Sequence, residues 1–504
     1  MNKQLSSVLV IAFGLLGALF VVFQVLSTGK NALGEAYKYF LPMAFFIGLL
    51  APRFACYLLA FFAVYIDVGK KLLVVGESLY FADLFYILGI PPVMLLGACL
   101  SKALALFWNW TSSSMKMQRE SFLLACGLIL AVSLVVVIRS GVSAESVKEL
   151  ANSAAYLGLI FLVPAVFREK GEMLHYLKVI VFLMVPGALY GLYHFFFGMN
   201  EFELIYYSSG LSMNEIYVLS GEGVFGPFSS QGALSSSMMI SALFCALVYF
   251  LGPEERPRFL NPVLAACLFI VFFATAILSL KRGPLLILPV ALVLYLVLRS
   301  RGGLVLSLLG GAAMILLFVF TGDWVADQLP NWQLALNKML GVESSTEQNL
   351  FRIRTLNVRM VEFASLSDPE NWVPFGLAFG QGNEKYDYAV HAGIVGMVHK
   401  LGYVPLIALL LIFLPCIWVV HGIYLKVLRM GVRYANLLFC IGAATLVVPM
   451  LGLSNFSVFP VPFLAGLCFG AFWRARYFVD AKATEKADDT ETEEIPILAG
   501  HYAN

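Results

Sequence analysis

The sequence predicts an all-α polytopic membrane protein with about 12 to 14 transmembrane helices. Two observations support this class: 60% of the 504 residues are hydrophobic and only 13% are charged, whereas soluble domains carry about 25% charged residues. A third is the recurrence of apolar stretches close to the roughly 20 residues that a helix needs to cross a bilayer. The net charge of +2 gives no basis for nucleic-acid binding.

Fourteen apolar segments are candidate spans, of which the second and third are short. They lie near residues 8–26, 38–51, 54–67, 82–100, 121–138, 151–167, 177–196, 231–250, 262–280, 283–298, 303–320, 388–415, 434–452 and 455–473. The eight cysteines all fall within apolar stretches and form no CxxC pair, so we predict neither disulfides nor a metal site.

The distribution of Lys and Arg sets the orientation, because short cytoplasmic loops retain positive charge. With the N-terminus in the cytoplasm, 16 basic residues fall in short cytoplasmic loops, and residues 197–230 on the opposite side contain none. Both termini are therefore predicted to be cytoplasmic. Residues 1–480 form one transmembrane domain with large outer loops at 197–230 and 321–390. The acidic tail 481–504 has little to bury and is predicted to be disordered.

Basic residues on the outer side are exceptions to this pattern and are therefore candidates for function. Lys281 and Arg282 stand in a short turn between two spans, directly before Gly283 and Pro284. The turn places Arg282 at the outer membrane interface. A snorkelling anchor at that interface is an equally good interpretation of this arginine.

The outer loop 321–390 has five basic residues, and three of them lie close together: Arg352, Arg354 and Arg359. The segment 351–366 is predicted to be an amphipathic helix on the membrane surface with its apolar stripe facing the membrane, because apolar residues recur at helical spacing. These apolar residues are Ile353, Leu356, Met360 and Phe363. The planar guanidinium fork of arginine suits a diphosphate, but attraction to lipid head groups explains the cluster equally well.

His391 opens the next apolar segment at the predicted outer interface. An imidazole there can accept a proton near neutral pH, although a lone histidine more often has a structural role. His399 lies about two turns deeper and is predicted to be packed or hydrogen-bonded. The chain has no Walker, GxGxxG or DxD motif in a cytoplasmic segment, which disfavours a nucleotide-dependent reaction.

Several motifs between about residues 220 and 420 together resemble the O-antigen ligase and polymerase family of bacterial envelope glycosyltransferases. They are GVFGPFSSQGALSSSMM (223–239), S-x-x-R-G (279–283), the arginine segment 351–359, P-x-G-x-x-x-G (374–380) and VHAGIVGMVHKLGYVP (390–405). Each motif is loose alone, and their order along the chain carries the resemblance.

The resemblance implies a metal-independent, inverting glycosyltransferase in the bacterial inner membrane, without a cofactor. It would take glycan from an undecaprenyl-diphosphate carrier on the periplasmic face and pass it to a hydroxyl group. His391 matches the family's base, Arg282 the arginine of the S-x-x-R-G motif, and Arg354 the loop arginine, with Arg352 and Arg359 as alternatives. Lys281 is a further candidate diphosphate contact.

Two positions depart from the family pattern. The family usually has Asn after the histidine, where this chain has Ala392, and Val358 stands where a Trp often follows the loop arginine. An acceptor contact or orienting group is therefore in question, and so is the choice among the three loop arginines.

The leading functional hypothesis is a polysaccharide polymerase for O-antigen or exopolysaccharide. The alternatives are a ligase that moves finished glycan to lipid A core or protein and, in another class, a transporter or flippase of lipid-linked oligosaccharide. The expected partners are the lipid-linked oligosaccharide and membrane lipids, with chain-length regulators or export proteins as further candidates and no nucleic acid.

Overall fold

The computed structural model describes most of the helical core of the chain. The described residues are 32–75, 83–112, 115–140, 144–209, 224–253, 255–279, 281, 283–298, 324, 360–381, 393–411, 414, 418, 422, 433–450 and 458–475. The predicted spans near 8–26 and 303–320, most of the loop 321–390 and the tail 481–504 lie outside these residues.

All regular structure in the described residues is helical, which confirms the all-α class for this part of the chain. The α-helices are α2 (Ala32–Leu50), α3 (Pro52–Val75), α4 (Asp83–Trp108), α5 (Lys116–Ser140), α6 (Ala144–Asn152), α7 (Leu159–Val166), α8 (Lys170–Phe197), α9 (Glu201–Ser208), α11 (Gln231–Ala246), α12 (Arg256–Phe259), α13 (Pro262–Leu278), α14 (Ile287–Leu298), α17 (Gly393–Leu401) and α19 (Arg433–Met450). A further helix spans Val461–Ala475. Short 3-10 segments are η3 (Ala154–Gly158), η4 (Leu247–Tyr249), η5 (Gly283–Leu286), η6 (Ser365–Ser367), η7 (Pro369–Asn371) and η8 (Leu377–Phe379).

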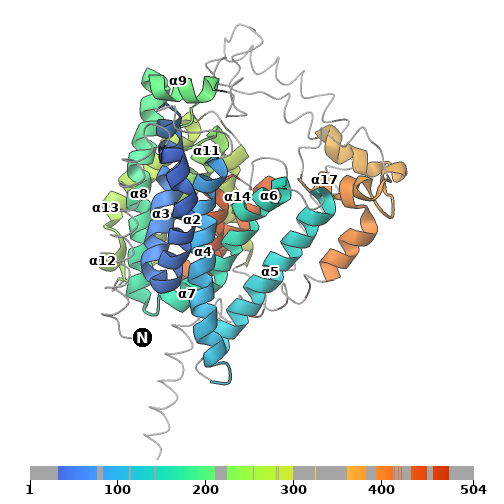
Figure 1. Cartoon of the computed structure of the whole chain (residues 1–504), viewed down its shortest axis with the longest axis horizontal. Helices are drawn as coiled ribbons and strands as arrows, with labels where there is room; N and C mark the ends of the chain where they lie inside the picture. The colour runs from blue at the N-terminus through green and yellow to red at the C-terminus, as the bar shows by residue number, and fades with distance from the viewer. Residues whose placement is uncertain are drawn as a thin grey trace, which may run out of the picture.

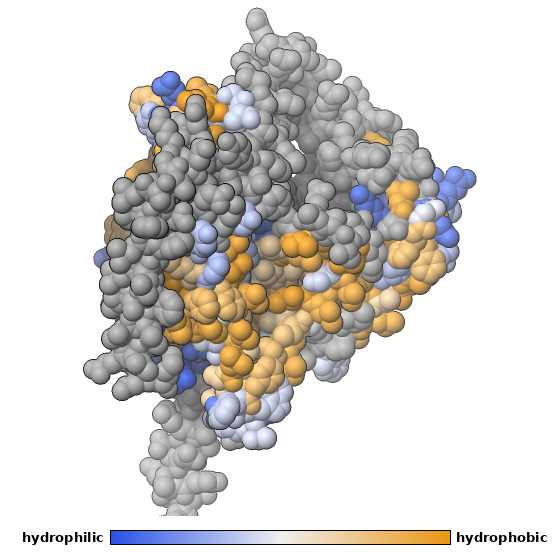
Figure 2. All heavy atoms as spheres, viewed as in Figure 1, coloured by the Kyte–Doolittle hydropathy of each residue, from blue (hydrophilic) through white to orange (hydrophobic). Residues whose placement is uncertain are grey.

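Four of the described helices are long and apolar enough to cross a membrane. They are Tyr86–Trp108, Lys116–Leu134, Lys170–Phe197 and Gln231–Tyr249, and shorter apolar helices coincide with six more of the predicted spans. Apolar side chains gather in a band across the middle of the face shown in Figure 2. Composition and helices together therefore define a membrane protein, while the total of 12 to 14 spans stays a prediction.

Helices α2 and α4 lie against each other at backbone distance, because a glycine faces the partner helix from each side. A Cβ atom on Gly48 would lie 2.2 Å from the Met94 carbonyl oxygen, and one on Gly97 would lie 2.2 Å from the Phe45 carbonyl oxygen. Small residues permit this close approach between apolar helices, which gain little from the hydrophobic effect inside a membrane.

Helix α11 is almost completely enclosed by the bundle. Every residue from Ala233 to Cys245 is buried, and the helix contacts α8, α13, α14 and α19. Its first turn is capped by Ser230, whose hydroxyl accepts a hydrogen bond from the Ala233 N–H at 3.1 Å. Four serines of this helix are fully buried: Ser235, Ser236, Ser237 and Ser241. The centre of the fold thus directly follows the loop 224–230, which belongs to the motif 223–239.

Helix α3 is longer than the span predicted near 54–67, because it continues to Val75. Its last two turns lie beside α9, which caps the upper end of α3 and α8 in Figure 1. The residues that extend α3 beyond the apolar stretch include Lys70 and Lys71, both buried. The helix can continue past the apolar stretch because these charged side chains find partners inside the protein.

The segment 351–366 is described from Met360 onward, as a helix over 360–364 followed by η6. Met360 and Phe363 are buried whereas Val361 is half exposed. The two described members of the predicted apolar stripe are therefore covered by the protein itself. At these two residues the prediction that the stripe faces the membrane surface was wrong.

Candidate functional site

The residues proposed from the family resemblance are largely outside the described part of the chain. His391, Arg282, Arg352, Arg354 and Arg359 all lie there. Lys281 is described and its side chain is exposed. Their roles stay predictions, and the structure instead gives the geometry of the segments that flank them.

The first pair of flanking segments meets at Ser235 and Lys281. The Ser235 hydroxyl lies 3.1 Å from the Lys281 carbonyl oxygen and 3.2 Å from that of Ala276, so it can donate to either. Ser279, fully buried, donates its hydroxyl proton to the Ala276 carbonyl at 2.7 Å. Two motifs of the resemblance, 223–239 and 279–283, are therefore in direct contact although about 40 residues separate them.

The second pair of flanking segments meets at Gly376 and Gly402. The Gly376 N–H donates to the Leu401 carbonyl at 2.9 Å, and the Val404 N–H donates to the Pro374 carbonyl at 3.1 Å. A Cβ atom on Gly376 would lie 2.4 Å from the His399 carbonyl oxygen, and Gly402 has φ of +79°, so both positions require glycine. The P-x-G-x-x-x-G motif thus pairs by backbone with the end of α17.

His399 is buried at this junction, and its Nε2 atom lies 3.1 Å from the Ser365 hydroxyl. This contact confirms the prediction that His399 is a packed and hydrogen-bonded residue. It also ties α17 to η6, so the described end of the 351–366 segment is fixed relative to the helix that follows His391.

A buried ionic network at the α9 end of the bundle was not predicted from the sequence. The Lys71 ammonium donates to Glu203 Oε1 at 2.7 Å and to the Gly226 carbonyl at 3.1 Å, and both side chains are fully buried. The Tyr207 ring lies 5.4 Å from the same ammonium. This pair joins α3 to α9 and to the loop 224–230.

His194 of α8 completes the surroundings of Glu203. The Gly226 N–H donates to His194 Nδ1 at 3.1 Å, so the ring proton lies on Nε2, which is 2.5 Å from Glu203 Oε2. The Tyr190 hydroxyl donates to the same carboxylate oxygen at 2.9 Å. Glu203 therefore accepts hydrogen bonds from Lys71 of α3 and Tyr190 of α8, and His194 lies in close contact with the same carboxylate.

The electrostatics favour an ionised Glu203. Burial alone would raise the pKa of this carboxyl group, but the hydrogen bond from His194 and the charge of Lys71 outweigh burial and hold the pKa below its usual value. The carboxylate therefore stays charged at physiological pH and remains a partner for Lys71.

A second ion pair on α3 joins Lys70, which directly precedes Lys71, to Asp67. Lys70 donates to Asp67 Oδ1 at 2.8 Å and to the Ser229 hydroxyl at 2.6 Å, while the Ser229 N–H donates to Asp67 Oδ2 at 2.9 Å. Asp67 and Lys70 are both buried. The two carboxylates and the two ammonium groups of the network balance in charge.

The network therefore holds a loop of the protein in place and does not present its ammonium groups to a ligand. Each ammonium group is already bound by a carboxylate, and their contacts end on Gly226 and Ser229, within the motif 223–239. Gly226 has φ of +53° and lies against Gly191, so the loop is also closely packed. The arrangement fixes this loop relative to α3, α8 and α9, directly before α11 begins.

One signal in the sequence could have identified part of this network. With the N-terminus in the cytoplasm, Lys70 and Lys71 follow a span on the outer side, and they are exceptions to the positive-inside pattern just as Lys281 is. Their partners could not be identified in this way. Glu203 stands 132 residues away along the chain.

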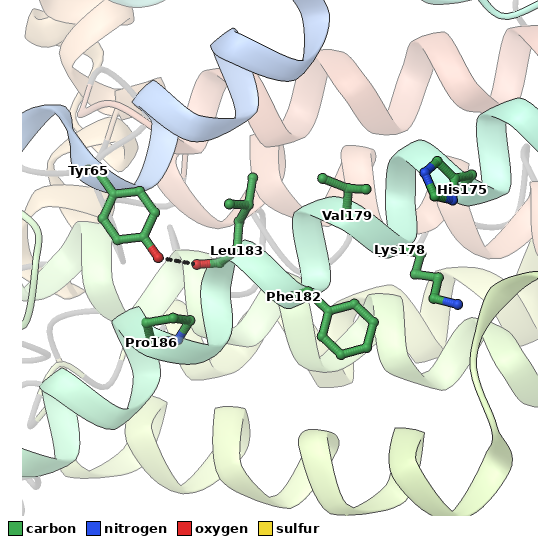
Figure 3. A pocket seen from close by; sticks show the side chains of 7 residues that line it. All are labelled: Tyr65, His175, Lys178, Val179, Phe182, Leu183 and Pro186. Atoms are coloured by element: carbon green, nitrogen blue, oxygen red, sulfur yellow. Dashed lines mark hydrogen bonds between the residues drawn. The ribbon is translucent and has the colours of Figure 1, made fainter.

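A cavity of about 320 Å³ lies apart from this network, along residues 175–186 of α8 and beside Tyr65 of α3 (Figure 3). Its lining shares no residue with the ion pairs. Among the described residues, no group of three or more His, Cys, Asp or Glu side chains could hold a metal ion.

The fold and the network define an all-α membrane protein with a sealed ionic cluster at one end of its helical bundle. No protein-family model, curated protein or solved structure matches this chain.

Proposed function

We propose that this protein is a glycosyltransferase of the bacterial inner membrane that elongates a polysaccharide carried on undecaprenyl diphosphate. The observation that supports the proposal is the meeting of motifs far apart in sequence. The Ser235 hydroxyl contacts the carbonyl of Lys281, and Gly376 pairs with Leu401. Motifs that contribute to one site must converge, and these two contacts bring four of the five motifs together in pairs.

The proposed chemistry is a direct displacement at the anomeric carbon of the donor sugar. The acceptor hydroxyl oxygen forms the new glycosidic bond while the bond from that carbon to the diphosphate oxygen breaks. His391 takes the proton of the hydroxyl group, and undecaprenyl diphosphate leaves with the bonding electron pair. Arg282 and one of the three loop arginines hold the diphosphate and offset its developing charge. Lys281, next to Arg282, is a further candidate contact.

The ionic network has a supporting role in this proposal. Lys71 and Lys70 are bound to carboxylates and almost inaccessible, so they do not bind the diphosphate. They hold Gly226 and Ser229 in place. Helix α11 begins two residues later, and its Ser235 contacts the Lys281 carbonyl. The carrier lipid and surrounding membrane lipids are the proposed partners, and chain-length regulators or export proteins could act on the product.

A transporter of the same lipid-linked substrate is the second candidate, and one observation favours it. Charged side chains buried inside a helical membrane protein often mark a transport path. Here, however, Lys71 and Glu203 are fully buried, and each has its ionic partner within the protein. The network also lies at the end of α3 beyond the apolar stretch, which favours a structural role.

The test of the enzyme is an assay of purified protein in detergent with lipid-linked repeat units. We expect longer lipid-linked glycan, because an enzyme needs no sealed membrane. His391→Ala should lower the rate by about 100-fold or more, the typical contribution of a general base. Arg282→Ala should be similarly inactive, while Arg282→Lys should be intermediate because lysine lacks the bidentate fork.

Lys116→Ala is the matched control, since it removes an exposed cation at the start of α5, away from every motif. Its rate should equal that of the unmodified protein. Single alanine variants of Arg352, Arg354 and Arg359 identify the loop arginine. Full activity of His391→Ala with folded protein would remove the proposed base, and a lack of elongation by the unmodified protein would favour the transporter. Transfer to lipid A core and not to a lipid-linked unit would indicate the ligase.

A further inference from the structure

The cavity along α8 has the form of a groove with one polar end and one apolar end. Its lining residues recur three or four positions apart, so they share one face of the helix. His175 and Lys178 lie at one end in Figure 3, and Phe182 and Pro186 lie further along. Tyr65 closes the apolar part from α3, where its hydroxyl donates to the Leu183 carbonyl at 3.1 Å.

The polar end of the groove contains a cation that the neighbouring carboxylates do not neutralise. Glu172 precedes Lys178 on α8 by less than two turns and binds Arg53 at 2.8 Å. Glu255 is the partner of Lys170 at the start of the same helix. Among the described residues, Lys178 has no ion pair with a carboxylate. The groove therefore offers a positive charge at one end that an anionic group can neutralise.

The length of the groove matches one leaflet of a bilayer. From His175 to Pro186 the helix rises by about 16 Å, at roughly 1.5 Å per residue. This is close to half of the roughly 30 Å hydrocarbon core. The polar end lies toward the start of α8, near Arg53, and thus at the end of the bundle opposite the ionic network.

We propose that this groove binds one anionic phospholipid. The phosphate group lies at Lys178, with His175 as a hydrogen-bonding neighbour, and an acyl chain lies along Val179, Phe182 and Leu183. The charge at one end and the apolar lining at the other fit these two parts of a lipid. The site is separate from the proposed glycan-transfer site and does not depend on it.

The experiment is native mass spectrometry of the purified full chain in detergent, titrated with phosphatidylglycerol or phosphatidylethanolamine. We expect the unmodified protein to bind the first phosphatidylglycerol more tightly than the first phosphatidylethanolamine. Lys178→Ala should weaken phosphatidylglycerol binding by about fivefold, the factor expected for one lysine near an anionic lipid. Binding of phosphatidylethanolamine should not change.

Three further variants separate the effect of charge from the effect of shape. Val179→Trp fills the groove and should reduce the first binding step for both lipids, while Lys116→Ala, which removes an exposed cation elsewhere, should bind like the unmodified protein. A thermal melt in the same detergent verifies folding, and Lys178→Arg should restore the preference. Lys178→Ala with an undiminished preference, or Val179→Trp with undiminished binding, would overturn the proposal.

Discussion

Lys71 and Glu203 form an ion pair with no access to water, and its energetic meaning differs from that of a surface pair. Removing two charges from water costs several kcal/mol per ion, which mutual attraction and further hydrogen bonds must offset. Here the ammonium also binds the Gly226 carbonyl, and the carboxylate also binds His194 and Tyr190. The pair is therefore stable only as a complete set.

Removing the charge of one member of this pair should lower the free energy of unfolding far more than removing the charges of both. Lys71→Met leaves Glu203 buried without its cation and should lower the free energy of unfolding by about 3–5 kcal/mol. The double variant Lys71→Met with Glu203→Gln should recover a substantial part of this loss. Thermal and denaturant unfolding in detergent measures both effects.

Arg53→Ala is the matched control for this comparison. Arg53 and Glu172 are also 2.8 Å apart, but the Arg53 side chain is 55% exposed. Its removal should therefore cost less than about 1 kcal/mol. Equal losses for Lys71→Met and Arg53→Ala would mean that the buried pair is no more important than a surface contact.

Prediction from the sequence succeeded at the residue scale where the signal was local. The packed state of His399 followed from its depth in an apolar segment, and its contact with Ser365 confirmed it. Lys70 and Lys71 carried a detectable signal as basic residues on the outer side. Glu203 and His194 did not, because an acidic residue in an outer loop and a histidine at the end of a span are ordinary until folding brings them together.

At the scale of elements, boundaries were harder to predict than the existence of helices. Hydropathy ended the span near residue 67, whereas α3 continues to Val75. Hydropathy treats every charge as exposed to water, but these charges are paired inside the protein. The orientation of the apolar stripe at Met360 and Phe363 was wrong for a similar reason, since a stripe indicates burial without identifying what covers it.

The contact between α2 and α4 allows a test with glycine substitutions. Gly97→Ala places a Cβ atom against the Phe45 backbone and should separate the two helices, lowering the melting temperature by several degrees. Gly69→Ala in α3 meets no atom within 4 Å and should be neutral or stabilising, because alanine favours a helix by about 1 kcal/mol over glycine. Thermal unfolding of each variant in the same detergent measures this difference. Equal melting temperatures for Gly97→Ala and Gly69→Ala would contradict the close contact between α2 and α4.

On the scale of the whole molecule, α8 is long enough to cross the whole hydrocarbon core. Its 28 residues span about 42 Å, more than the roughly 30 Å hydrocarbon core. Arg258 lies 3.4 Å from the Cβ position of Gly171 at its start, and α9 follows its end (Figure 1). Composition was sufficient to predict this kind of fold, but the number of spans depends on segments outside the described residues.

The orientation of the protein can be tested at the two ends of α8. Ser208→Cys on α9 and Arg258→Cys on α12 both replace exposed residues. A membrane-impermeant maleimide should label Ser208→Cys in intact spheroplasts and Arg258→Cys only after lysis. Cys126 and Cys267 are replaced by serine in both proteins because these native thiols are exposed. The reverse pattern of labelling would place the proposed glycan-transfer site on the cytoplasmic face and contradict the proposal.

The sealed ion pair also has a consequence for how the chain is made. Glu203 is translated 132 residues after Lys71, which takes roughly 7 to 26 seconds at typical rates of synthesis. In the later part of this interval the lysine is outside the ribosome while its carboxylate does not yet exist. The end of α3 must therefore wait in contact with water or lipid head groups, and it can close into the bundle only after α8 and α9 have emerged.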